Sequence, residues 1–151
     1  MAAEISWATE VRPLTDQEVT RAVDAALEHG GRASALIEVA LVDDATLAEL
    51  HGRFLDDSSV TDVMSFDLGD EGGGPVGEVY VSVERARIVA ERRGASWERE
   101  LTLYLVHGVL HLCGFDDLCD ADREAMRTAE AAVLESLGLP ADGLEHGLGG
   151  E

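Results

Sequence analysis

The stretch HGVLHLCGFDD, residues 107–117, carries two histidines separated by three residues, then a glycine and two aspartates. Side chains four residues apart lie on the same face of an α-helix, so His107 and His111 can bind one ion together. Gly114 is suited to end that helix in a left-handed conformation, which would bring one of the aspartates back as a third ligand. Three protein ligands and one open position are typical of a catalytic zinc site, in which the metal activates a water molecule.

The residues around the histidines predict a buried helix. Over residues 101–112 the polar side chains besides the two histidines are Thr102 and Tyr104. A buried histidine pair needs polar partners, and one metal ion supplies a partner to both rings. The alternative is a pair of core histidines hydrogen-bonded to the backbone. Gly108 lies inside this helix, where glycine costs about 1 kcal/mol relative to alanine, so we expect another backbone or a substrate to approach closely there.

The apolar patterns along the chain predict an α/β fold. Strands are expected at residues 5–11, 36–42, 63–68 and 78–82. Helices are expected at residues 16–29, at 83–93 and at 121–137, the last of them capped by Asp120. Two further helices are expected, one from Asp43 or Asp44 to residue 54, and one that begins after a Ser96 cap and contains both histidines. We expect one domain over residues 1–137 and a flexible, glycine-rich tail over residues 138–151, with His146 a bystander.

The charge of the chain is strongly acidic. Thirty-one acidic residues and eleven basic ones, all arginine, give a formal net charge of −20, which is the wrong sign for a general nucleic-acid binder. Five arginines nevertheless cluster just before the histidine helix, at residues 85, 87, 92, 93 and 99. Two interpretations remain open: a local basic groove in which Arg85, Arg92 and Arg93 contact RNA phosphates, or a solvated helix face paired with neighbouring glutamates.

The two cysteines, Cys113 and Cys119, are too few for a disulfide framework. We expect Cys113 to pack at the apolar end of the helix, whereas Cys119 is an alternative metal ligand. The N-terminal segment shows no signal peptide, and no apolar run approaches the roughly 20 residues that a membrane span needs. These features predict a cytoplasmic protein that does not associate with membranes.

The histidine stretch resembles the signature H-G-x-L-H-L-x-G-[YF]-D-H of the YbeY family of bacterial endoribonucleases, which act in ribosomal RNA maturation. The chain departs from it at the last position, where Asp117 stands in place of the third histidine. Upstream, TDVMSF (residues 61–66) is similar to the family's T-[DN]-V-L-S-F, and GEVYVS (residues 77–82) is similar to G-[DE]-I-V-I-S. The resemblance covers residues 36–137.

The resemblance implies a small mixed sheet of about four strands covered by helices, with a metal cleft. It implies a metal-dependent enzyme that cleaves single-stranded ribosomal RNA at the 16S 3′ end, with the ribosomal small subunit or its associated proteins as partners. His107, His111 and Asp117 would be the metal ligands and catalytic residues, and Asp116 would support a ligand or cap the turn. One divalent ion is expected, with zinc first and Mn²⁺ or Ni²⁺ as alternatives. A carboxylate ligand makes harder ions such as Mn²⁺ more competitive.

The sequence also raises two functions other than an endoribonuclease, a ribosome-associated binding module and a metallopeptidase. Leu55 stands six residues before Thr61, where the family has an arginine, and Val60 replaces the usual proline. This difference and the acidic charge favour a ribosome-associated module that binds metal with little nuclease activity. A metallopeptidase is disfavoured, because H-E-x-x-H enzymes use the glutamate after the first histidine as general base, and Gly108 occupies that position here.

Overall fold

The protein is described by a computed structural model that covers residues 3–55, 63–69, 74–115 and 119–141. Within these ranges the elements follow in the order β1 (Ala3–Trp7), α1 (Asp16–His29), β2 (Ile37–Val42), α2 (Asp44–Leu55), β3 (Val63–Asp67), β4 (Gly77–Ser82), α3 (Val83–Arg93), α4 (Trp97–Leu112) and α5 (Asp120–Ser136). Every predicted strand and helix is present. Among the described residues, no helix combines the length and apolar character that crossing a membrane requires.

The described strands form one mixed sheet in the order β1-β2-β4-β3. Strands β1, β2 and β4 are parallel, and β3 pairs antiparallel with β4. The α/β class and the mixed sheet expected from the sequence are therefore confirmed. The first strand is shorter than predicted and ends at Trp7 rather than residue 11, because Trp7 already lies opposite Leu41, close to the end of its partner strand at Val42.

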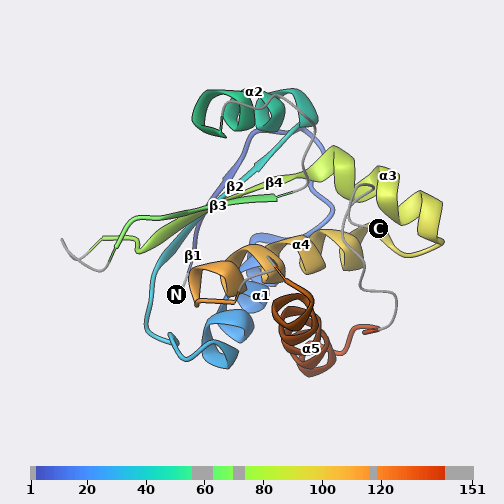
Figure 1. The fold of residues 1–151 in the computed structure, drawn as a ribbon. Helices are drawn as coiled ribbons and strands as arrows, with labels where there is room; N and C mark the ends of the chain where they lie inside the picture. Colours follow the sequence, from blue (N-terminus) through green and yellow to red (C-terminus); the bar gives the residue numbers. More distant parts are fainter. Residues whose placement is uncertain (1–2, 56–62, 70–73, 116–118, 142–151) are drawn as a thin grey trace.

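The helices cover the two faces of the sheet unequally. Figure 1 shows α1, α4 and α5 on one side and α2 on the other. The larger core, between the sheet and α1, α4 and α5, includes Leu27, Val79 and Leu105. The smaller core, under α2, is built on Val42, Leu47 and Met64. The sheet is thus buried most deeply on the side that carries α4.

Local signals in the sequence set the helix boundaries. Thr15 caps α1 through a capping box with Glu18, and Ser96 caps α4 by accepting a hydrogen bond from the Arg99 amide. Asp43 accepts from the Thr46 amide at 2.8 Å at the start of α2. The Asp120 cap predicted for α5 is wrong: the helix begins at Asp120, whose carboxylate pairs with Arg123, and its N-cap residue is Cys119.

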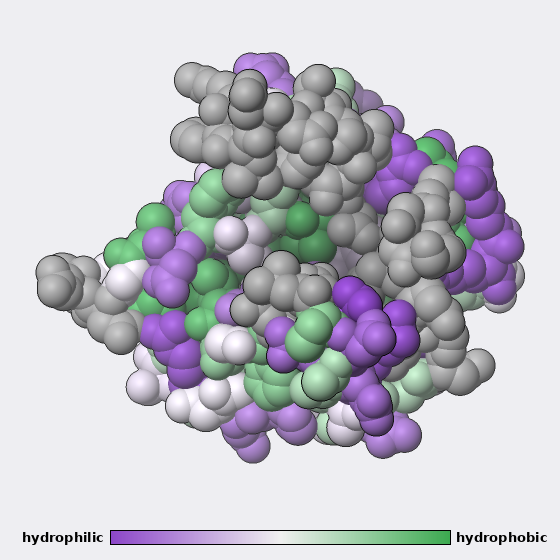
Figure 2. Space-filling view, viewed as in Figure 1, coloured by the Kyte–Doolittle hydropathy of each residue, from purple (hydrophilic) through white to green (hydrophobic). Residues whose placement is uncertain are grey.

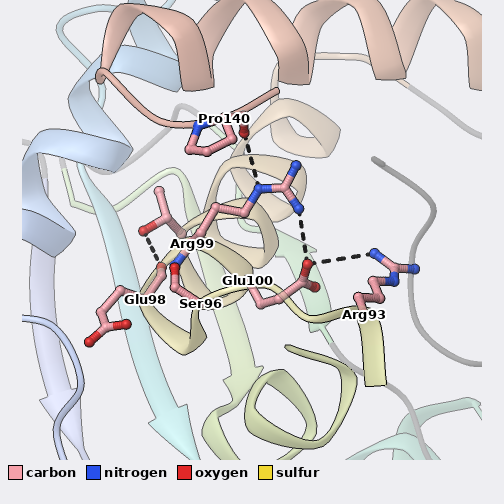
Figure 3. A network of polar contacts seen from close by, with 7 residues as sticks. Arg93, Ser96, Glu98, Arg99, Glu100 and Pro140 are labelled. Carbon is pink, nitrogen blue, oxygen red and sulfur yellow. Dashed lines mark hydrogen bonds and ion pairs between the residues drawn. The ribbon is translucent and has the colours of Figure 1, made fainter. Parts of the chain in front are cut away.

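Helix α4 is buried from Arg99 to Leu110, as its apolar sequence predicts. Its first turn also buries charge. Glu100, which is fully buried, accepts a hydrogen bond from Arg99 Nη1 at 3.0 Å and lies 3.6 Å from Arg93 Nη1 (Figure 3). Two arginines on one carboxylate offset much of the cost of burying it.

The chain that follows α5 packs on this end of α4. Arg99 Nε donates to the Pro140 carbonyl at 3.1 Å, and Leu139 and Ala141 pack against Leu103. The packed part of the protein therefore extends past residue 137 to Ala141. The remainder of the predicted tail, residues 142–151, lies outside the described residues.

Gly108 lets α4 approach the sheet closely. A Cβ at this position would lie 2.7 Å from Val79 Cγ1 and 3.0 Å from Val63 Cγ2. Ser65 Oγ donates to the Gly108 carbonyl at 2.8 Å, which fixes β3 to the middle of the helix. The close approach expected from the sequence is present, but side chains of β3 and β4 make it, rather than a backbone or a substrate.

We predict that Gly108→Ala destabilises the protein, although alanine is the better helix former. Overpacking destabilises the folded protein by about 1–3 kcal/mol, whereas the higher helix propensity of alanine stabilises it by roughly 1 kcal/mol. The free energy of unfolding, measured with urea, should fall by about 1 kcal/mol. In a Val79→Ala background the same substitution should cost less, because the nearest clashing methyl group is gone. Equal costs in both backgrounds would contradict this explanation.

Candidate active site

Helix α4 brings the two histidines together. His107 Nε2 and His111 Nε2 are 3.1 Å apart, and the rings meet edge-on, with centroids 4.6 Å apart and planes at 76°. His107 is 6% exposed, whereas His111, one turn nearer the helix end, is partly exposed. The pair therefore presents two nitrogens to one point, which can be reached from the side of His111.

The chain turns back directly after the histidine pair. Phe115 N donates to the Leu110 carbonyl at 3.0 Å, and Gly114 N donates to the His111 carbonyl at 3.1 Å. Gly114 has a φ of 103°. This hydrogen-bond pattern is a Schellman motif, which reverses the chain through a residue with positive φ. The left-handed glycine predicted from the sequence is confirmed.

A third ligand is not found in the described part of the chain. Asp116 and Asp117 lie in residues 116–118, outside the described residues. Within the described ranges, no group of three or more histidine, cysteine, aspartate or glutamate residues is arranged to hold a metal. Asp117 as third ligand, Asp116 as its support and Cys119 as the alternative therefore remain predictions.

The buried carboxylate of Glu130 is a site residue that the sequence analysis missed. It extends from α5, is fully buried, and places Oε2 2.6 Å from His107 Nδ1. A signal for it exists in the sequence. Met126, Val133 and Leu134 form the apolar face of α5, and Glu130 lies among them at helical spacing. A glutamate on the buried face of a helix needs a polar partner, and His107 supplies one.

The arginines proposed to contact RNA have different environments. Arg85 Nη2 contacts Asp44 Oδ2 at 3.0 Å, and that carboxylate also accepts from Ser82 Oγ at 2.5 Å. Arg93 is directed to the buried Glu100 (Figure 3). Arg92 is exposed on α3, whose outer surface is hydrophilic in Figure 2, and it pairs with no carboxylate among the described residues. Of the three, Arg92 is the most accessible to a phosphate.

The two cysteines have different environments, and the packing of Cys113 predicted from the sequence is confirmed. Cys113 is half-buried at the end of α4, and a Cβ on Gly30 would lie 2.4 Å from its Sγ. Burial raises the pKa of the Cys113 thiol, while the nearby Arg32 guanidinium acts in the opposite direction. Cys119 is exposed before α5.

These features, two converging histidines on a buried helix followed by a tight turn, define a site able to donate two nitrogen ligands to an ion. The sequence profile of the family described as Endoribonuclease YbeY matches residues 4–138. The Endoribonuclease YbeY of Desulfitobacterium hafniense is 35% identical over 158 residues, covering 92% of this chain and 99% of that protein. The chain belongs to the YbeY family of endoribonucleases, which are hydrolases that act on RNA.

One further relative and one solved structure are also similar to this chain. The Endoribonuclease YbeY of Carboxydothermus hydrogenoformans is 38% identical over 122 residues, covering 80% of this chain and 85% of that protein. The solution structure of TM1509 from Thermotoga maritima superposes with a TM-score of 0.59 at 22% identity, covering 98% of this chain and 99% of that one. This structural similarity supports the fold.

We predict that iodoacetamide alkylates Cys119 faster than Cys113, on the order of tenfold near pH 8, because the thiolate is the reactive form. A raised pKa means that Cys113 forms less thiolate at a given pH, so its rate should approach that of Cys119 only as pH rises. Peptide mass spectrometry after timed labelling measures both rates. In urea, where both cysteines are exposed, the two rates should become similar, and a folded-state rate at Cys113 equal to that at Cys119 would contradict the prediction.

Proposed function

We propose that this protein is a metal-dependent endoribonuclease that hydrolyses single-stranded ribosomal RNA in ribosome maturation. The observation that carries the proposal is the convergence of His107 and His111 within a chain that belongs to the YbeY family. Cleavage of ribosomal RNA, near the 3′ end of the 16S molecule, is proposed from the family resemblance. The ribosomal small subunit or its associated proteins are the proposed partners, and the cytoplasm is the proposed location.

The spacing of the histidine nitrogens supports a tetrahedral metal site. Two Zn–N bonds of about 2.0–2.1 Å at the tetrahedral angle separate the nitrogens by about 3.3 Å. The Nε2 atoms of His107 and His111 are 3.1 Å apart, so small ring movements would suffice to bind zinc. Asp117 is the proposed third ligand, and the fourth position would remain open. Zinc is the proposed ion, with Mn²⁺ or Ni²⁺ as alternatives.

The residues of the chain would then have separate roles in hydrolysis. A divalent ion held there would supply Lewis acidity to the phosphodiester and to the attacking water. His107 and His111 would hold the ion, and the Schellman turn at Gly114 would return the aspartates toward it. Arg92, which is exposed, would contact an RNA phosphate. Arg85 and Arg93, whose guanidinium groups already contact carboxylates, would contribute less.

We predict that the purified protein binds about one divalent ion per chain, and that His107→Ala or His111→Ala removes this binding. Asp117→Ala should weaken binding strongly, whereas Asp117→His, which restores the family pattern, should retain the ion. Asp116→Ala is the matched control, and it should mainly cost about 1 kcal/mol of stability through a lost turn hydrogen bond. Elemental analysis and chelator competition measure these outcomes.

Two results would change the assignment of the ligands. If Asp117→Ala binds the ion as tightly as the parent, another group is the third ligand. Protection of Cys119 from alkylation by the added ion would then identify that cysteine. Full occupancy in the double variant His107→Ala/His111→Ala would contradict the site itself.

We predict metal-dependent cleavage of single-stranded ribosomal RNA that stops on chelation. Activity should fall steeply with salt, because a chain of net charge −20 can hold RNA only through a small local basic region. Arg92→Ala should weaken RNA binding without changing metal content, and Arg87→Ala is a control on the same helix. Leu55→Arg should raise activity if this position serves as the family's arginine does.

The competing function has its own outcome in the same assay. The acidic charge and the pairing of Arg85 with Asp44 favour a ribosome-associated binding module. A metal-loaded protein that co-sediments with ribosomal subunits, yet leaves ribosomal RNA intact, would support that module instead of the enzyme.

A further inference from the structure

We propose that Glu130 is a positioning residue, which fixes the ring orientation and the tautomer of His107 so that its Nε2 lone pair faces the metal. The inference rests on the proposed metal site and concerns how the chain prepares that site. The contact joins α5 to α4, between residues 23 positions apart in the sequence.

The contact is short and shielded from water. Glu130 Oε2 lies 2.6 Å from His107 Nδ1, Glu130 is fully buried, and His107 is 6% exposed. A buried carboxylate is costly without a donor, and the hydrogen bonds that an ionised carboxylate accepts are strong. Its position is also constrained, since Met126 and Val133 on the same helix face pack in the main core. Glu130 therefore holds the imidazole of His107 in one orientation.

The chemistry of the two groups assigns the tautomer. An ionised carboxylate only accepts hydrogen bonds, and a neutral imidazole has one donor and one acceptor nitrogen. With Glu130 ionised and His107 neutral, we assign the hydrogen to Nδ1 of His107, which leaves the lone pair on Nε2. This is the nitrogen that lies 3.1 Å from His111 Nε2. The ligand atom thus points to the shared position before any ion binds.

This arrangement predicts an effect on affinity as well as on structure. Groups that orient a metal-binding histidine through its second nitrogen commonly change metal affinity 10–100-fold when they are replaced. Glu130→Gln keeps the size of the side chain but can turn its amide to donate as well as accept, so it no longer selects one tautomer. We expect Zn²⁺ affinity to fall about 10–100-fold in this variant.

Glu100→Gln is a matched control for the burial of charge. Glu100 is also a fully buried glutamate, and it lies on α4 itself, seven residues before His107. It contacts Arg99 and Arg93 rather than a histidine (Figure 3). Two helical turns, about 10 Å along the axis, separate it from His107. This variant should lose stability but retain the parent's Zn²⁺ affinity.

The experiment combines Zn²⁺ titration against a chelator of known affinity with long-range ¹H–¹⁵N spectra of the histidines in the metal-free protein. The parent should show His107 with its hydrogen on Nδ1, and Glu130→Gln should show a mixture of tautomers together with the loss of affinity. The Nε2–H tautomer in the parent would overturn the proposal even if Glu130→Gln fails to fold.

The remaining outcomes separate this inference from the proposed function. A parent that binds no Zn²⁺ contradicts the metal site, while the spectra still test the orientation of His107. A parent that binds Zn²⁺ and a Glu130→Gln variant that binds it equally well overturn the role of Glu130 alone. Equal losses of affinity in Glu130→Gln and Glu100→Gln would assign the effect to general destabilisation and would also overturn it.

Discussion

The close contact between α4 and the sheet at Gly108 is the constraint on which the rest of the structure depends. Because no side chain stands between them, Val63 and Val79 pack directly on the helix, and Ser65 bonds to its mid-helix carbonyl. The helix is thereby held deep in the larger core. His107, the residue before Gly108, is consequently buried beside α5, while His111, one turn nearer the end of the helix, is partly exposed.

Burying α4 in this way requires that its polar side chains be paired, and two glutamates have central parts in that pairing. At the start of the helix, Glu100 lies between Arg99 and Arg93. Near its other end, Glu130 of α5 contacts His107. The first arrangement ties α4 to α3 and to the segment after α5, and the second holds the imidazole of His107. Removing one partner of such a pair costs several kcal/mol, because the other is left buried and unpaired.

The same ion pairs limit which arginines of this strongly acidic chain can bind RNA. Of the arginines clustered before the histidine helix, Arg85 contacts Asp44, and Arg93 and Arg99 contact Glu100. Most of these arginines therefore have a structural role, as expected if this helix face is paired with acidic residues. Arg92 remains exposed to contact a phosphate. Recognition of RNA must then depend on a few local contacts rather than on the overall field of the protein.

The sequence by itself determined the elements, the histidine pair and the turn at Gly114, because helix periodicity, caps and a positive φ depend on neighbouring residues. It also predicted the mixed sheet, through the family resemblance. Only the tertiary structure decided that Glu130 contacts His107, that side chains of β3 and β4 approach Gly108, and that Arg85 and Arg93 face carboxylates. These contacts join residues distant in the sequence, so they arise from the way α4 and α5 pack against the sheet and each other, which local patterns do not specify.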